Sequence, residues 1–304
     1  MAMQSVSGTI FQIQRWSIND GEGIRSTVFL KGCPLRCQWC ANPESWHGNP
    51  EVLFLQEKCT GCGQCAVVCD AAAVRIDPVS RKAVTSGACL GCGKCCQVCA
   101  GGARKQIGMR VTVDDVMKII QRDAVFYRES GGGVTFSGGE PFLQAEFLRQ
   151  LVLACGRIGL DTAVETCGFY DWQQVADIFA HLNCVFIDCK HMDDAIHRKW
   201  TGVGNQRILE NIQRISQLPL RTIVRVPLIR EVNANEQNIR EMCRFLVQKT
   251  GVREVELLAY HDYGKSKHHA AGLPDITFSA LGEAETDRLK QIIADYGITL
   301  ADFK

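Results

Sequence analysis

The chain has 304 residues, with 34 basic and 33 acidic side chains and a formal net charge of +1. This balance gives no electrostatic reason to expect a nucleic acid or an anionic membrane as a partner. The length accommodates a core domain of roughly 200–250 residues together with an extra module.

Seventeen cysteines are the outlier in the composition. The first residues show no basic start followed by an apolar run, so we expect no signal peptide. No stretch of about 18 apolar residues occurs, so we expect no membrane span. An odd number of cysteines in tight groups, without an export signal, indicates metal binding and not a disulfide framework. We therefore expect a cytoplasmic protein that works under reducing, anaerobic conditions.

The first predicted strand, residues 26–32, leads directly into a loop that contains three cysteines. Cys33, Cys37 and Cys40 are separated by three and then two residues. Three thiolates on a 4Fe–4S cluster would leave one iron without a protein ligand. An open position on a metal is where a substrate or cofactor binds, as on catalytic zinc. A zinc knot or a disulfide knot is the alternative for this loop.

Residues 50–106 contain a repeat and are predicted to form an inserted domain. Residues 59–69 (CTGCGQCAVVC) and 89–99 (CLGCGKCCQVC) both space four cysteines by two, two and three residues. This spacing resembles that of two-cluster bacterial ferredoxins, in which the fourth cysteine binds the other cluster. The resemblance assigns one 4Fe–4S cluster to Cys59, Cys62, Cys65 and Cys99, and the second to Cys89, Cys92, Cys95 and Cys69. A pair of zinc sites is the alternative.

Six further cysteines lie scattered in apolar segments: Cys96, Cys155, Cys167, Cys184, Cys189 and Cys243. Free cysteine behaves as a small hydrophobic side chain, so most of them are predicted to be buried without a role in the chemistry. Cys167 and Cys189 follow predicted strands closely enough to line a site there.

After residue 106, apolar runs of strand length alternate with helical patterns. Strands are predicted at residues 133–137, 162–166, 184–190, 221–229 and 254–260. Helices are predicted at residues 112–123, 144–159, 171–182, 206–218, 235–251 and 283–297. Strands that alternate with helices indicate a parallel α/β fold, either a barrel or an open doubly wound sheet.

Polar residues at the strand ends decide between these two folds. They are Cys33, Gly138, Gly139, Glu140, Glu165, Asp188, Lys190, Arg225 and His261. The carboxyl ends of all strands meet at one mouth of a (β/α) barrel, whereas an open sheet offers one crevice. We therefore predict a partial (β/α)6 barrel from residues 1–49 and 107–304, with the ferredoxin-like module of residues 50–106 inserted into it.

The three-cysteine loop resembles the signature of the radical S-adenosylmethionine superfamily. SGGEP at residues 137–141 resembles its second motif. The resemblance implies that the amino and carboxylate groups of S-adenosylmethionine bind the open iron. It also implies that Gly138, Gly139 and Glu140 contact the methionyl ammonium, since glycine lets the backbone approach a ligand closely.

The match extends to the glycyl-radical-enzyme activating enzymes of this superfamily. SINDGEGIRSTVFLKGC (17–33), CANPES (40–45), ETCGF, IDCK, RVPLI and AYHDYGKSK resemble that group in order. The two-cluster insertion resembles the branch that serves dehydratases, decarboxylases and lyases.

The resemblance also implies the roles of single residues in the cofactor site. It places Asp188 and Lys190 near the methionyl carboxylate and His261 beside the adenosine. The other cofactor-binding residues expected on this basis are Cys40, the flanking Trp39 and Ala41 on the adenine side, and Glu165, Cys189 and Arg225 at the strand ends. Glu165 and Asp188 are expected to hold a monovalent cation. Lys190 and the three loop cysteines are the expected catalytic residues.

The implied reaction is reductive cleavage of S-adenosylmethionine. One electron breaks the S–C5′ bond, and the 5′-deoxyadenosyl radical takes a Cα hydrogen from a glycine of a partner glycyl radical enzyme. The two ferredoxin-like clusters would relay electrons from a flavodoxin or ferredoxin. Two alternatives stay open: a radical S-adenosylmethionine enzyme that acts on a small molecule or as a maturase, and a non-catalytic iron–sulfur electron-transfer protein.

Overall fold

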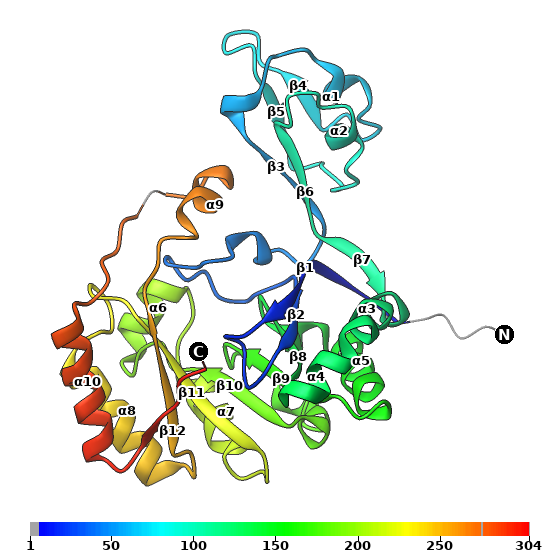
Figure 1. The fold of residues 1–304 in the computed structure, drawn as a ribbon. Coiled ribbons are helices and arrows are strands. Elements are labelled where there is room, and N and C mark those ends of the chain that lie inside the picture. Colours follow the sequence, from blue (N-terminus) through cyan, green and yellow to red (C-terminus); the bar gives the residue numbers. More distant parts are fainter. Residues whose placement is uncertain (1–5, 275, 304) are drawn as a thin grey trace.

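A computed structural model describes residues 6–274 and 276–303, and a curved sheet of nine strands dominates it (Figure 1). Six neighbouring strands run parallel: β2 (Arg25–Leu30), β8 (Gly133–Gly138), β9 (Asp161–Thr166), β10 (Cys184–Asp188), β11 (Arg221–Leu228) and β12 (Glu254–Ala259). All six strands predicted from the sequence are therefore present, and they lie side by side in chain order.

The edges of the sheet differ from its centre. β1 (Ser7–Ser17) pairs antiparallel with β2, and β7 (Met109–Thr112) pairs antiparallel with β1. At the other edge, β13 (Thr299–Leu300) runs parallel to β12. These three strands were not predicted. Since β7 and β13 stand at opposite ends of the strand order, the sheet is open and mixed.

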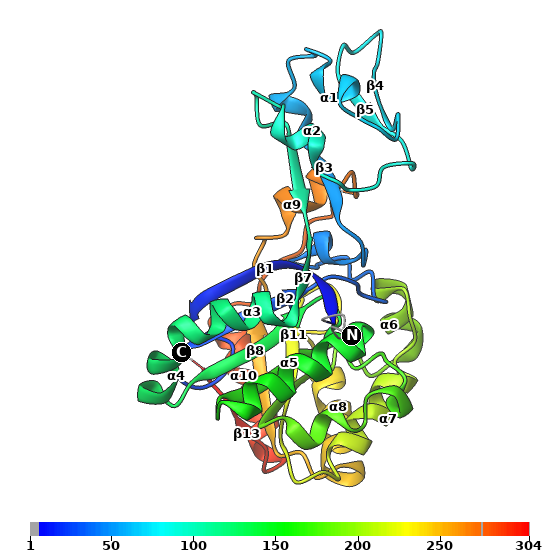
Figure 2. The same ribbon diagram turned by 90° about the vertical axis from the view of Figure 1, so that its right-hand side faces the viewer.

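Helices cover the outer side of the curved sheet (Figures 1 and 2). They are α3 (Val113–Ile120), α4 (Ala124–Ser130), α5 (Ala145–Arg157), α6 (Asp194–Thr201), α7 (Gln206–Ile215), α8 (Glu236–Lys249) and α10 (Glu283–Asp295). The short helix α9 (Lys265–Ala270) lies apart from them, near the segment that stands away from the sheet. Short 3₁₀ turns are η1 (Pro43–Ser45), η2 (Gln56–Lys58), η3 (Gln121–Asp123), η4 (Pro141–Gln144), η5 (Trp172–Gln174) and η6 (Ile178–His181). Within the described residues, no helix combines the length and apolar character that crossing a bilayer requires.

The helix predicted at residues 171–182 is wrong, because only the turns η5 and η6 form there. The Gln174 carbonyl accepts a hydrogen bond from the Arg149 guanidinium at 3.0 Å, and the Ile178 amide turns to the Val175 carbonyl. Phe179 stacks on Phe142, with 4.9 Å between ring centroids. Tertiary packing here overrides a helical pattern.

The two faces of each parallel strand have different surroundings. Outward-facing side chains such as Val164, Ile187 and Val224 belong to the large core beneath the helices. Inward-facing side chains such as Phe186 and Ile223 form a small separate cluster on the concave face. Successive residues of a strand point to opposite faces, so this alternation decides which polar side chains reach the interior of the partial barrel.

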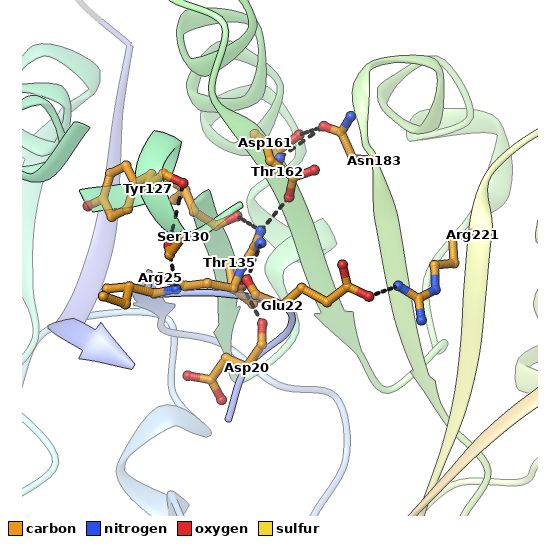
Figure 3. Close-up of polar contacts among 12 residues, drawn as sticks. Asp20, Glu22, Arg25, Tyr127, Ser130, Thr135, Asp161, Thr162, Asn183 and Arg221 are labelled. Atoms are coloured by element: carbon orange, nitrogen blue, oxygen red, sulfur yellow. Dashed lines mark hydrogen bonds and ion pairs between the residues drawn. The ribbon is translucent and has the colours of Figure 1, made fainter. Parts of the chain in front are cut away.

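A polar network closes the amino-terminal end of the partial barrel (Figure 3). The buried Arg25 guanidinium donates to Thr135 Oγ1 at 2.7 Å and to the Asp161 carboxylate at 2.8 Å. Glu22, in the loop between β1 and β2, pairs with Arg221 at the start of β11 at 2.5 Å. The loop is therefore tied across the concave face, opposite the carboxyl ends of the strands.

Residues 51–107 leave the large sheet and return on adjacent strands. β3 (Glu51–Phe54) pairs antiparallel with β6 (Arg104–Ile107), and β4 (Val74–Ile76) pairs with β5 (Ala83–Thr85). The short helices α1 (Gln64–Val67) and α2 (Lys94–Gln97) pack beside them. Figure 2 shows this segment standing away from the large sheet. It has its own small core, which includes Cys65, Val74, Ala83 and Cys95.

Candidate active site

The three-cysteine loop is fixed at the carboxyl end of β2 by backbone hydrogen bonds. The Arg36 amide donates to the Thr201 carbonyl at 2.7 Å, and the Gln38 amide donates to the Trp200 carbonyl at 3.1 Å. Cys33, Cys37 and Cys40 form a cluster with Leu35 and Cys167. The end of α6 therefore supports the loop from outside, and the three thiols gather on its inner side.

Burial controls the protonation of these thiols. It raises the pKa of Cys40 to about 11 and that of Cys37 further. A hydrogen bond with the Cys167 thiol lowers the pKa of Cys33. At neutral pH, Cys37 and Cys40 therefore keep their protons until a metal displaces them, as is usual for thiolate ligands.

Gly138 and Gly139 lie where a side chain could not. Gly138 has a φ of +114°, and a Cβ there would stand 2.4 Å from the Leu30 carbonyl oxygen. A Cβ on Gly139 would stand 2.2 Å from the Gly32 carbonyl oxygen. The absence of side chains lets the end of β8 press against the end of β2 and present its backbone next to the cysteine loop.

Glu140 is fully buried and its carboxylate is already satisfied. It accepts hydrogen bonds from Thr166 Oγ1 at 2.7 Å, from the Cys167 amide at 2.9 Å and from the Phe142 amide at 3.1 Å. Burial raises the pKa of this carboxyl group. Glu140 therefore fastens the end of β9 to the turn after β8, and the structure does not bring it to the cavity described below.

Asp188 and Lys190 form an ion pair at the end of β10. Lys190 Nζ donates to Asp188 Oδ2 at 2.6 Å, and the Lys190 side chain is buried. Asn233 donates to the Lys190 carbonyl at 2.8 Å and holds this turn in place. Cys189, between the two charged residues, points the other way and packs against Met192 in the large core.

Aromatic residues lie on the other side of the three-cysteine loop from the Asp188–Lys190 pair. Trp39 meets Phe278 edge to face, with ring centroids 6.2 Å apart, and His261 stacks on Tyr263 at 4.3 Å. The His268 ring, from α9, makes a hydrogen bond with the Cys40 carbonyl at 2.9 Å. The segment after β12 therefore folds back over the cysteine loop.

Glu165 and Arg225 lie deeper on the concave face. Arg225 pairs with both Glu165 and Glu256, and its guanidinium lies 3.9 Å from the centre of the Phe186 ring. Ser137 donates the other hydrogen bond to Glu165. Arg225 thus supplies a positive charge at the position where Glu165 was predicted to help hold a cation, and that cation site stays a prediction.

Replacing Arg225 with methionine is expected to lower the free energy of unfolding by about 3–5 kcal/mol, because two buried carboxylates lose their shared cation. Burial raises the pKa of Glu165 and Glu256 while Arg225 lowers it. Without Arg225 both pKa values rise further, so the folded state binds more protons than the unfolded state. The loss in the free energy of unfolding therefore becomes smaller as the pH falls. Urea unfolding at two pH values measures this.

The matched control for that change is Arg221→Met, since Arg221 pairs with Glu22 and Glu254 at the exposed end of the same strand. Exposed pairs of this kind contribute about 0–1 kcal/mol. Equal losses in the two variants, or a deficit that grows at low pH, would contradict the assignment of a buried ion network.

A cavity of about 240 Å³ brings most of the predicted site residues together. Those that line it are Cys33, Cys37, Trp39, Cys40, Ala41, Gly138, Gly139, Asp188, Lys190 and His261. Glu140, Glu165, Cys189 and Arg225 are not among its lining residues. The cavity therefore joins the three loop thiols, a glycine backbone, one ion pair and aromatic side chains.

Sequence reasoning did not single out several other lining residues, including Asn42, Ser45, Trp46 and Tyr260. Asn42 and Ser45 fall in the CANPES segment, and Tyr260 precedes His261. Their position next to recognised motif residues was the only signal that could have pointed to them. Cys167, which was predicted to be able to line the site, does line it.

The two cysteine repeats of the insert have the same local structure. Gly63 and Gly93, both with a φ of +78°, precede α1 and α2. The Ala73 amide donates to Cys69 Sγ at 3.2 Å, and the Ala103 amide donates to Cys99 Sγ at the same distance. Backbone amides therefore already point at the fourth sulfur of each repeat.

A second cavity, of about 140 Å³, tests the expected ligand set. Its lining includes Cys59, Cys62, Cys65 and Cys99, together with Arg104. In residues 6–274 and 276–303, no three His, Cys, Asp or Glu side chains are arranged to hold a single ion. The cavity brings together the four thiols of the first expected ligand set.

Comparisons with known proteins agree with this chemistry. The radical SAM superfamily matches residues 89–246, and a 4Fe-4S single cluster domain matches residues 19–70. The isethionate sulfite-lyase activating enzyme of Nitratidesulfovibrio vulgaris is 38% identical over 97% of this chain and 97% of its own. The 4-hydroxyphenylacetate decarboxylase activating enzyme of Clostridioides difficile is 37% identical over 98% of this chain and 96% of its own.

A solved structure supports the fold alone. The radical SAM methyltransferase from Sphaerobacter thermophilus aligns with a TM-score of 0.51 at 16% identity, over 91% of this chain and 65% of that one. The two activating enzymes support more than the fold, since their similarity extends over nearly the whole chain. The chain therefore belongs to the glycyl-radical-enzyme activating enzymes of the radical SAM superfamily.

Proposed function

We propose that this chain activates a glycyl radical enzyme of the dehydratase, lyase or decarboxylase type. The observation that carries the proposal is the cavity that joins Cys33, Cys37 and Cys40 to the glycine backbone of residues 138–139 and the Asp188–Lys190 pair. With three thiolates for a four-iron cluster, one iron keeps an open position for a cofactor.

The residues around the cavity fit S-adenosylmethionine. The Gly138–Gly139 backbone offers carbonyl groups to the methionyl ammonium, and Lys190 offers a positive charge to the methionyl carboxylate. Asp188 holds Lys190 in place, as their 2.6 Å contact supports. Trp39, Ala41 and His261 face the adenosine. When bound, the cluster supplies the electron that cleaves the S–C5′ bond, and the resulting radical takes a Cα hydrogen from the partner's glycine.

We assign residues 1–49 and 107–304 to the catalytic partial barrel, and residues 50–106 to a ferredoxin-like domain with two 4Fe–4S clusters. The separate core of that segment and the repeated amide–sulfur contacts support this division. The two clusters would pass electrons from a flavodoxin or ferredoxin to the site cluster. A cytoplasmic, anaerobic location follows from this chemistry and remains a prediction.

The comparisons do not choose the partner enzyme. Two relatives with different partner enzymes in their names are almost equally similar to this chain, at 38% and 37% identity. Family membership argues against a non-catalytic electron carrier. A radical S-adenosylmethionine enzyme that acts on a small molecule, or as a maturase, is the remaining alternative.

Incubating the reconstituted chain anaerobically with S-adenosylmethionine, a reductant and candidate glycyl radical enzymes of the lyase, dehydratase and decarboxylase types should produce a glycyl radical in the enzyme that it activates. Electron paramagnetic resonance detects the radical, and one 5′-deoxyadenosine should form for each one. The alternative predicts 5′-deoxyadenosine without a radical on the second protein. An enzyme with its radical glycine replaced by alanine is the control.

Asp188→Ala and His261→Ala should keep the iron but weaken the binding of S-adenosylmethionine. Each change removes a polar contact in the cavity, worth about 1–3 kcal/mol, which corresponds to about 5–150-fold weaker binding. Calorimetry under anaerobic conditions measures this. His181→Ala changes an exposed histidine away from the cavity and is the control. Unchanged affinity in both site variants would remove these two residues from the cofactor site.

A further inference from the structure

Arg104 is a buried cation between the two cysteine repeats. It begins β6, and only 4% of its surface is exposed. Its Nη1 atom donates to Thr85 Oγ1 at 3.1 Å and lies 3.9 Å from Cys95 Sγ. The guanidinium also lies over the Phe54 ring, 5.3 Å from the ring centre. Residues from β3 and β5 therefore hold its position.

Two donors of this guanidinium lack an acceptor. Nε and Nη2 are buried and make no hydrogen bond in the described part of the chain, where no carboxylate pairs with Arg104 either. Buried arginine is almost never left without a partner, because an unpaired buried charge is costly. Arg104 lines the 140 Å³ cavity together with Cys59, Cys62, Cys65 and Cys99. The missing acceptor therefore belongs in or beside that cavity.

We propose that Arg104 donates hydrogen bonds to sulfur atoms of the iron–sulfur clusters of both repeats and thereby raises their reduction potentials. This inference rests on the proposed function, because it requires the two clusters to be present. Its Nη1 contacts Cys95 of one ligand set, and its unpaired donors line the cavity of the other set, which includes Cys65. Arg104 is thus a positioning residue for electron transfer and takes no part in bond breaking.

The direction of the effect follows from charge. When a cluster accepts one electron from a flavodoxin or ferredoxin, its net charge becomes more negative by one and no bond forms or breaks. A nearby cation and N–H···S hydrogen bonds stabilise the reduced form more than the oxidised form. Removing Arg104 should therefore make both clusters harder to reduce.

The test is a redox titration of full-length protein followed by electron paramagnetic resonance. It is best done in the Cys33, Cys37 and Cys40→Ala background, where only the insert clusters contribute to the signal. In that background, Arg104→Met should lower the ratio of reduced to oxidised cluster at a fixed potential by at least about tenfold. For a one-electron couple this corresponds to a midpoint potential that is lower by about 59 mV. Arg104→Lys should recover part of the shift, because it keeps the charge and has fewer donors.

Arg75→Met is the matched control, since Arg75 is an exposed arginine of the same segment. An unchanged midpoint in Arg104→Met with about eight irons bound, or an equal shift in Arg75→Met, would overturn the inference. Loss of the clusters from both Arg104 variants would also overturn it, because Arg104 would then serve assembly and not potential. About zero iron in the background protein itself would instead contradict the proposed ferredoxin-like clusters.

Discussion

Replacing Cys33, Cys37 and Cys40 together with alanine is expected to lower the iron content from about twelve to about eight atoms per chain and to abolish cleavage of S-adenosylmethionine. The three thiols are the ligands that the loop after β2 offers to the cavity. Their removal takes away the cluster that delivers the electron and the iron that the cofactor binds. Iron analysis and chromatography of 5′-deoxyadenosine measure the two effects.

The control for this triple change removes three thiols elsewhere. Cys155 and Cys243 are buried in the large core, and Cys184 lies partly buried at the start of β10. Their joint replacement by alanine should leave about twelve irons and keep cleavage. If 5′-deoxyadenosine still forms in the loop variant, or if its iron content stays near twelve, the central assignment is wrong.

The parallel strands were predictable because both of their faces are buried. The run CVFI at the start of β10 is a continuous apolar segment, as is usual for strands covered on both sides. β1 was missed because Gln12, Gln14 and Arg15 interrupt its apolar pattern, and part of it is exposed. β13 has only two residues, which is too short for any periodic signal.

Part of the candidate site could also be predicted from the sequence, and part could not. The spacing of the cysteines indicated the loop after β2, and the position of Asp188 and Lys190 at the end of a predicted strand indicated that both lie near the site. The period of two along β10 would have shown that Cys189, between these residues, must face the opposite side. The hydrogen bonds of Glu140 were not predictable, because the Thr166 hydroxyl and the Cys167 amide that donate to it come within reach only once β8 and β9 are paired.

Arg225 shows a further limit of the sequence. A lone arginine in an apolar strand signals a buried ion pair, but the sequence does not say which carboxylates it meets. The parallel register aligns Arg225 with Asp188 of β10 and with Glu256 of β12. This register places Glu256 beside Arg225, but Glu165 lies on β9, two strands away, and only the folded structure shows that it meets the same guanidinium.

Replacing residues 57–103 with a short Gly/Ser turn should separate electron supply from chemistry. β3 and β6 are paired from Phe54 and Arg104 back to Glu51 and Ile107. A turn of about two to five residues can therefore close the hairpin without moving the barrel. The insert and the segment around α9 together line a separate cleft of about 710 Å³, which includes Lys82 and His269. The catalytic cavity, by contrast, has no lining residue from the insert.

With about four irons retained, this variant should still cleave S-adenosylmethionine when a strong small-molecule reductant supplies the electron. Turnover driven by flavodoxin should collapse, because the two relay clusters are gone and electron transfer must cross the distance they bridged. The full-length chain assayed with both electron sources is the control.

Full flavodoxin-driven activity in the shortened chain would remove the relay role from residues 50–106. Loss of cleavage with the chemical reductant, at an intact iron content, would show instead that the insert shapes the active site, since neither the cluster ligands nor the cavity lining would have changed.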